Sequence, residues 1–219
     1  MTYWTESTQA MTTEERVQYI YNRLRAKNLT DTEARAMLAN IEVETGGSFD
    51  PAQLQKGSRK DPAFGLFQFD PRGLGLAKPY LEYVENREDK DPYSIDNQID
   101  FMAESITGEY APGAKYIGAG NIIKFREAAE EGLTPAIRQF SGGKGTGIQG
   151  ILNPGVPHMN RREKAASNID TLLKDIPTGG VVVELTSGEP TEEMTKPSEL
   201  RGDKSFLNTF MDDIVNRFR

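Results

Sequence analysis

Residues 30–51, "TDTEARAMLANIEVETGGSFDP", combine a buried helix with a charged end. Thr30 and Glu33 form the capping-box pattern that starts a helix. The apolar residues that follow recur at helical spacing: Ala34, Met37, Leu38 and Ile41. Two glycines then end the helix, because glycine adopts the left-handed conformation of a helix C-terminus. Glu42 and Glu44 therefore stand in the last turn, at the rim of an apolar core.

Apolar stripes of the same kind predict a mainly α-helical fold with a short loop or β region. The other segments with helical spacing are 12–24, 94–106, 121–131, 134–141 and 160–176. We expect Thr134 to cap the fourth of these and Asn160 to cap the fifth. Residues 45–80 are rich in Gly, Pro and Asp, which predicts loops with at most short strands.

The pattern divides the chain into four parts. We expect residues 1–12 to form an N-terminal arm and residues 13–177 to form the main helical domain. Residues 178–203 are rich in Gly, Pro and Glu and predict an extended linker. Residues 204–219 form an amphipathic helix with an apolar stripe that includes Phe206, Phe210 and Ile214. This stripe predicts a docking helix for a partner, and packing on its own domain is an equal alternative.

Composition excludes several kinds of chemistry. The 219 residues include no cysteine and one histidine, so thiol catalysis, disulfides and ordinary cysteine or histidine metal sites are excluded, and no cofactor is expected. The net charge of −7 argues against nucleic-acid binding. The sequence contains no run of about 18 apolar residues, so membrane insertion is not expected. Residues 134–168 carry five basic side chains and one acidic one, which fits a polyanionic ligand or, more simply, a solvated helix face.

The position of Glu44 on its helix makes it a candidate general acid. It follows Ile41 by three residues, at the edge of the apolar stripe, whereas Glu42 points toward the other side. Burial would raise the pKa of the Glu44 carboxyl group, and a raised pKa suits an acid that works near neutral pH. From spacing alone, a solvated surface glutamate is the more common alternative.

A second motif, "AFGLFQF" at residues 63–69, places one amide among aromatic side chains. Apolar neighbours such as Phe67 would fix the amide of Gln68, and Gly65 would let the backbone approach a ligand closely. Taken alone, the motif is more often plain core packing.

Together, "ETGGSFDP" and "AFGLFQF" resemble the Glu-Ser and Gly-Leu-x-Gln pair of the lysozyme-like superfamily, which includes lytic transglycosylases. "SIDNQIDFMAESI" (94–106) and "NPGVPHMNRREKAASN" (153–168) are similar to later segments of the phage tail lysozyme family. The resemblance covers about residues 13–175. It implies a lysozyme-like fold, peptidoglycan as substrate and Glu44 as the catalytic glutamate. It also implies that Gln68 lines the sugar groove, beside Phe67 and Gly65.

Two departures from the family pattern concern the groove. The glutamate motif has an extra glycine, which could lengthen the turn after Glu44. The closing motif starts with Asn153-Pro154, where an acidic residue and proline are usual in the family. Neither departure removes Glu44 or Gln68, but both bear on the specificity of the groove.

The favoured function is cleavage of the β-1,4 bond between N-acetylmuramic acid and N-acetylglucosamine by a component of a phage virion. It would dock on phage structural proteins through residues 204–219 and act on the host cell wall or periplasm. A second carboxylate is needed for ordinary hydrolysis, yet Asp50, Asp61 and Asp70 first indicate turns. If none of them reaches the sugar, the substrate itself supplies the nucleophile. The alternatives are an inactive structural or docking protein with this fold and a free endolysin.

Overall fold

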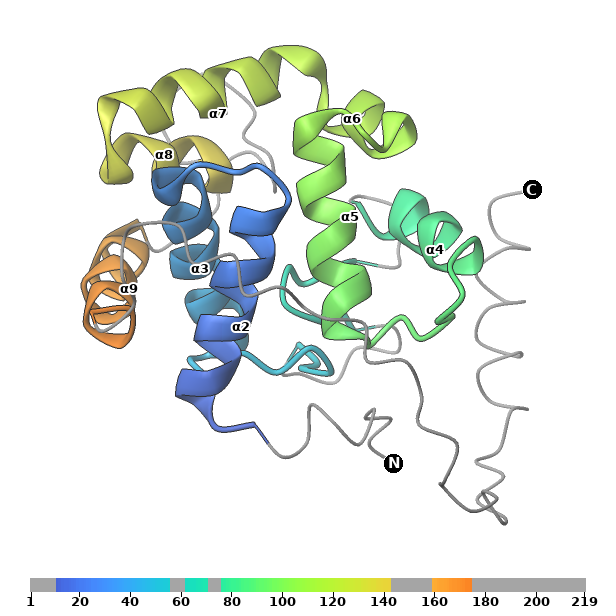
Figure 1. The fold of residues 1–219 in the computed structure, drawn as a ribbon, viewed down its shortest axis with the longest axis horizontal. Helices are drawn as coiled ribbons and strands as arrows, with labels where there is room; N and C mark the ends of the chain where they lie inside the picture. Colours follow the sequence, from blue (N-terminus) through green and yellow to red (C-terminus); the bar gives the residue numbers. More distant parts are fainter. Residues whose placement is uncertain (1–10, 56–61, 71–75, 143–158, 175–219) are drawn as a thin grey trace. The chain divides into compact units, whose positions relative to one another are not determined.

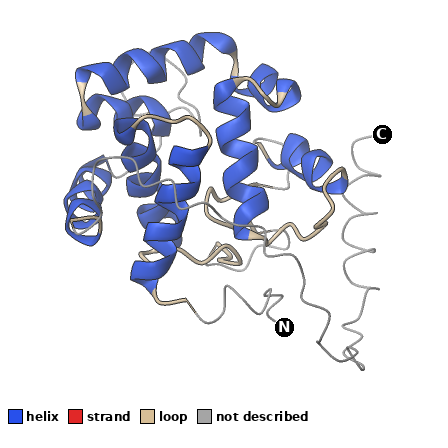
Figure 2. Cartoon of the chain, in the orientation of Figure 1, coloured by secondary structure: helices blue, strands red, loops and turns tan. Residues whose placement is uncertain are grey.

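The computed structural model describes residues 11–55, 62–70, 76–142 and 159–174, all within one unit, Met1–Thr178. These residues form helices joined by loops, without a β-strand among them (Figures 1 and 2). The helices are α2 (Thr13–Ala26), α3 (Asp31–Thr45), α4 (Ala77–Glu85), α5 (Ile95–Thr107), α6 (Ala111–Ile117), α7 (Ala119–Glu131), α8 (Leu133–Ser141) and α9 (Met159–Leu172). The predicted mainly α-helical class is confirmed. The linker and the docking helix, residues 178–203 and 204–219, lie outside the described residues.

Local sequence signals set the starts of the first helices. Both residues of each predicted capping box make their bonds at the starts of α2 and α3. In α3 the Thr30 backbone N–H donates to Glu33 Oε2 at 2.6 Å, and the Glu33 N–H donates to Thr30 Oγ1 at 3.2 Å. Ser94 caps α5 in a similar way, by accepting from the Asn97 N–H. These caps satisfy backbone donors that would otherwise lack partners in the first turn.

Several predicted boundaries are wrong. The helix expected at residues 134–141 begins at Leu133 with Gly132 at its cap, so Thr134 lies inside it. Asn160 also lies inside its helix, because α9 begins at Met159. Helices α4 and α6 were not predicted, and the start of α4 falls in the segment expected to be loop. Neither α4 nor α6 has a side-chain cap, although α6 has a proline in its first turn, and both helices pack against α5.

Helix α3 is the centre of the described core. It contacts α2, α7, α8 and α9, and Figure 1 shows it between α2, α8 and α9. Its side chains Met37, Leu38 and Ile41 are fully buried. Burying each such side chain contributes about 1.5–3 kcal/mol. The predicted apolar stripe of this helix is thus confirmed. Its burial holds α3 in place, and Glu42 and Glu44 lie in the last turn of this helix.

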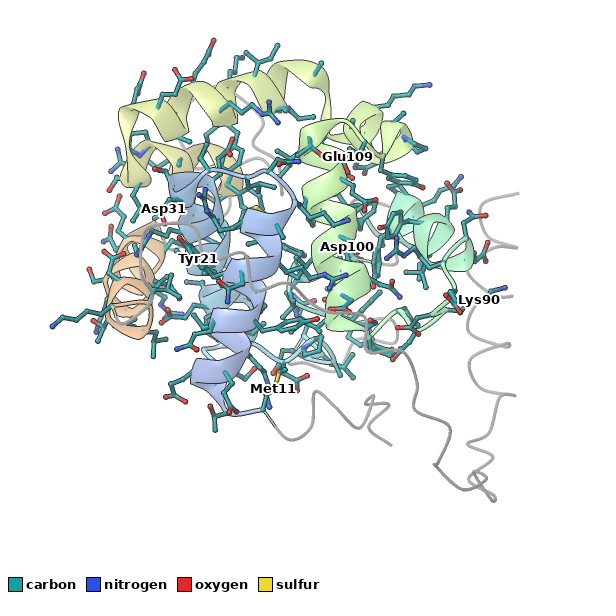
Figure 3. The ribbon with its side chains drawn as sticks, viewed as in Figure 1. Met11, Tyr21, Asp31, Lys90, Asp100 and Glu109 are labelled. Carbon is teal, nitrogen blue, oxygen red and sulfur yellow. The ribbon has the colours of Figure 1, made fainter. Side chains whose placement is uncertain are left out.

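An ion cluster joins α2 to α5 around the buried Asp100, which is labelled in Figure 3. Its carboxylate lies 2.8 Å from Arg23 Nε, 2.9 Å from Arg87 Nη2 and 3.7 Å from Lys27 Nζ. Burial lowers the pKa of Arg23, but the hydrogen bond and charge of Asp100 outweigh it and raise that pKa overall. The cluster holds α5 against α2, and α5 in turn supports the loops described below.

Candidate active site

The glycine pair ends α3 as the sequence predicts. Gly46 and Gly47 have φ angles of 63° and 83°, and the Gly47 N–H donates to the Glu42 carbonyl at 2.7 Å. A Cβ atom at either glycine would meet nothing within 4 Å. The left-handed backbone, rather than lack of space, therefore requires glycine here. The turn leaves Glu44 in the last helical turn, one residue before Thr45.

Helix α9 brings a buried arginine to Glu44. The Nη2 atom of Arg162 donates to Glu44 Oε1 at 2.6 Å, and its Nη1 donates to Asn40 Oδ1 at 2.7 Å. Asn40 and Glu44 are four residues apart and so lie on one face of α3. Arg162 is 2 % exposed and Asn40 is fully buried, whereas the Glu44 side chain is 24 % exposed. The Glu44 carboxylate is therefore held from the protein side, and its side chain stays partly exposed.

The surroundings of Glu44 differ from the sequence expectation. We expected an apolar setting that keeps the acid protonated, but the carboxylate contacts the guanidinium of Arg162. This contact joins residues 118 positions apart, so helical periodicity within α3 cannot reveal it.

Glu42 was expected on the other side of α3 from Glu44, yet it also contacts α9. Its Oε1 accepts a hydrogen bond from Asn168 Nδ2 of α9 at 2.7 Å, and its Oε2 is buried without a hydrogen-bond partner. Burial raises the pKa of Glu42, partly opposed by the bond from Asn168. Both acidic residues at the end of α3 thus face α9, and Glu42 has the environment expected for Glu44.

The loop after Glu44 is held by side-chain bonds. Thr45 Oγ1 donates to the Ile41 carbonyl at 2.7 Å and accepts from the Phe49 N–H at 3.1 Å. Phe49 has a φ of 51°, an unfavourable value for a residue with a side chain. The Ala52 N–H donates to Asp50 Oδ1 at 2.7 Å, so the interpretation of Asp50 as a turn former is confirmed. Burial raises the pKa of Asp50.

The Gln68 loop is a tight turn closed by paired backbone bonds. The N–H groups of Phe64 and Phe69 donate to each other's carbonyls at 3.1 and 2.8 Å. Within this turn Gln68 has a φ of 50°, and its Nε2 donates to the carbonyls of Gly65 at 2.9 Å and Gln53 at 3.2 Å. These bonds use the amide nitrogen and leave Oε1 as an acceptor. Backbone strain of this kind often occurs at functional sites.

Two residues expected to contact a ligand have packing roles. A Cβ atom at Gly65 would lie 2.5 Å from Gln98 Oε1, so the missing side chain makes room for Gln98, and contact of the Gly65 backbone with a ligand stays a prediction. Phe67 is 5 % exposed, and its ring centroid lies 5.9 Å from that of Phe69 and 6.4 Å from that of Phe140. Contact of Phe67 with a sugar remains a prediction.

The other sequence candidates contribute little to the described site. Asp61 and residues 143–158 lie outside the described residues, and Asp70 has an interaction within the chain. The described residues hold no group of His, Asp or Glu that could bind a metal ion. Of the basic segment, Arg138 pairs with Glu163 at 2.7 Å and Arg162 is buried, so the two do not present a free basic face.

Sequence reasoning missed Arg162, Asn40 and Gln98. A signal existed for Arg162, because it precedes the apolar residues Ala166 and Ile169 by four and seven positions. That spacing puts Arg162 on the inner face of α9 and leaves Arg161 outside. Gln98 shares the inner face of α5 with Ile95 and Met102, but no local signal indicates its partners Pro51 and Leu66, which lie 47 and 32 residues away.

Comparison with known proteins agrees with the motifs. A family model described as phage tail lysozyme matches residues 15–173. No curated protein and no solved structure gives a significant match. Among the described residues, no helix is long and apolar enough to cross a membrane. The matched range includes Glu44, Gln68 and Arg162, and the chain belongs to the phage tail lysozyme family.

Proposed function

We propose that this protein cleaves the β-1,4 bond between N-acetylmuramic acid and N-acetylglucosamine in peptidoglycan, with Glu44 as the catalytic acid. The observation that carries the proposal is the setting of Glu44 at the end of α3, where Arg162 fixes its carboxylate and 24 % of the side chain is exposed. A fully solvated Glu44 would have favoured an inactive docking protein. Membership of the phage tail lysozyme family supports the same substrate.

Arg162 and Gln68 have distinct roles in this proposal. The bond from Arg162 uses Glu44 Oε1, which leaves Oε2 to exchange a proton with the sugar. Gln68 directs its amide nitrogen to backbone carbonyls, so its Oε1 accepts from a hydroxyl or an acetamido N–H of the glycan. Catalytic groups work best when neighbouring side chains hold them in this way.

The proposed reaction needs no second carboxylate. Glu44 protonates the glycosidic oxygen while the bond from that oxygen to C1 of the muramic acid breaks. The 6-hydroxyl oxygen of the same muramic acid then bonds to C1, and its proton returns to Glu44. The products are a 1,6-anhydro end and a free 4-hydroxyl, without consumption of water. The engagement of Asp50 in its own turn supports this route over an ordinary hydrolysis with paired carboxylates.

We further propose that the enzyme is a component of a phage virion, either in the tail or as an internal component that is ejected into the host. Residues 204–219 would bind phage structural proteins through their apolar stripe, and residues 178–203 would serve as the linker. Local cleavage of the host wall would open a path for the genome through the periplasm. Family membership supports the association with a tail.

A zymogram on purified peptidoglycan tests the proposal with the wild type, Glu44→Gln and Glu42→Gln. We expect Glu44→Gln to abolish clearing, because glutamine accepts the bond from Arg162 but cannot supply a proton. Glu42→Gln should retain most activity. An inactive Glu42→Gln beside an active Glu44→Gln would assign the acid to Glu42. An inactive wild type would favour the docking protein.

A further inference from the structure

We propose that Gln98 is a positioning residue that fixes the two loops of the sugar groove relative to each other. The inference rests on the proposed function, because it assigns the groove to the loops that carry Glu44 and Gln68. Gln98 lies on α5 and is fully buried, so it acts through these loops and not by touching the glycan.

The side chain of Gln98 bonds to three separate segments. Its Nε2 donates to the Pro51 carbonyl at 2.8 Å and to the Pro92 carbonyl at 3.1 Å. Its Oε1 accepts from the Leu66 N–H at 2.7 Å. Pro51 belongs to the loop that follows Glu44, and Leu66 stands two residues before Gln68. One buried amide therefore joins both sides of the proposed groove to a rigid helix.

These bonds require a primary amide. Among side chains of this length, only glutamine offers two donors and an acceptor on one planar group. A glutamate would turn an oxygen toward the carbonyls of Pro51 and Pro92. A methionine would remove all three bonds and leave the Pro51 carbonyl and the Leu66 N–H without this partner. The two loops also bond to each other, because the Gly65 N–H donates to the Gln53 carbonyl at 2.8 Å and the Gln55 N–H donates to the Ala63 carbonyl at 2.8 Å. The amide of Gln98 adds the connection that ties both loops to α5.

The glycine of the "GLFQ" motif fits the same arrangement. A Cβ atom at Gly65 would lie 2.5 Å from Oε1 and 2.9 Å from both Cδ and Nε2 of Gln98. Gly65 also has a φ of 80°, which glycine alone adopts readily. A side chain at Gly65 would therefore displace the amide, so Gly65→Ala should reproduce the effect of changing Gln98.

A matched control comes from Tyr80. Its hydroxyl donates at 2.7 Å to the Pro92 carbonyl, which also accepts from Gln98, and its side chain is fully buried. Tyr80→Phe removes one buried hydrogen bond at that carbonyl and leaves the bonds to Pro51 and Leu66 intact. It should lower the melting temperature without moving either side of the groove.

The experiment measures glycan binding by the full chain in the inactive Glu44→Gln background. Isothermal titration calorimetry uses a soluble tetrasaccharide of alternating N-acetylglucosamine and N-acetylmuramic acid. We expect Gln98→Met and Gly65→Ala each to weaken binding at least tenfold, whereas Tyr80→Phe changes it less than twofold. The melting temperature of each variant is measured in parallel. All titrations are made below the lowest of these melting temperatures.

The possible outcomes separate the inference from the function on which it rests. Unchanged affinity in Gln98→Met, with a lower melting temperature, would overturn the positioning role and leave a purely stabilising one. Loss of cooperative melting in both Gln98→Met and Gly65→Ala would also overturn it. Absence of glycan binding by Glu44→Gln itself would overturn the proposed function first.

Discussion

Replacing Arg162 by methionine perturbs the contact that joins α9 to the candidate acid. Methionine has a similar length but removes the bonds to Glu44 Oε1 and Asn40 Oδ1. Asn40 is fully buried, so its oxygen cannot take water in exchange. Glu44 is 24 % exposed and can regain part of its hydration. We therefore expect Arg162→Met to lower both the stability of the domain and the rate of wall cleavage.

The magnitude follows from the two lost contacts. A buried acceptor without a partner costs about 1–3 kcal/mol. Breaking a fully buried ion pair costs about 3–5 kcal/mol. The cost of losing the Arg162–Glu44 pair is smaller, because Glu44 is partly exposed and the methionine side chain packs in an apolar setting. A net loss of about 2–3 kcal/mol results. For a domain of this size it corresponds to a fall of roughly 4–12 °C in melting temperature.

Thermal unfolding followed by circular dichroism measures this loss, with Arg161→Met as the control. Arg161 is the exposed neighbour of Arg162 on α9, and its replacement should change stability by at most about 0.5 kcal/mol. A double-mutant cycle with Glu44→Gln should show a coupling of about 1 kcal/mol or more. Equal melting of the two arginine variants, or additivity within about 0.5 kcal/mol, would refute the reasoning.

Three further predictions concern Glu42, the product and the tail. Burial raises the pKa of Glu42 above its ordinary value of 4.5, so ionisation of Glu42 destabilises the fold as pH rises. Glu42→Gln should therefore have a higher melting temperature than the wild type at about pH 7 and lose this gain below about pH 4. Equal melting temperatures of the two proteins at both pH values would contradict this. Mass spectrometry of released muropeptides should show anhydro ends, lighter by one water, whereas reducing ends would indicate hydrolysis and a role for Asp50, Asp61 or Asp70. A chain truncated to residues 1–177 should stay soluble and lytic in a turbidity assay but fail to join particles. Loss of its cooperative unfolding would place residues 204–219 in the domain core.

The sequence by itself determined the helical class, the starts of α2, α3 and α5, and the glycine stop after Glu44. Each depends on residues within a few positions of each other, because caps, apolar stripes and left-handed glycines act locally. It also provided the motifs on which family membership rests. Helix α4 was missed because it begins in the segment rich in Gly, Pro and Asp, and α6 because its seven residues are too few for a clear apolar stripe.

Only the tertiary structure decided the surroundings of the candidate acid. The partner of Glu44 comes from α9, 118 residues away, and the amide that joins the groove loops comes from α5. Helical spacing places Glu42 and Glu44 on different faces of α3, yet the structure shows that both side chains contact α9. A buried polar group takes its properties from whichever donors and charges the fold brings next to it, and these contacts leave no periodic trace in the sequence.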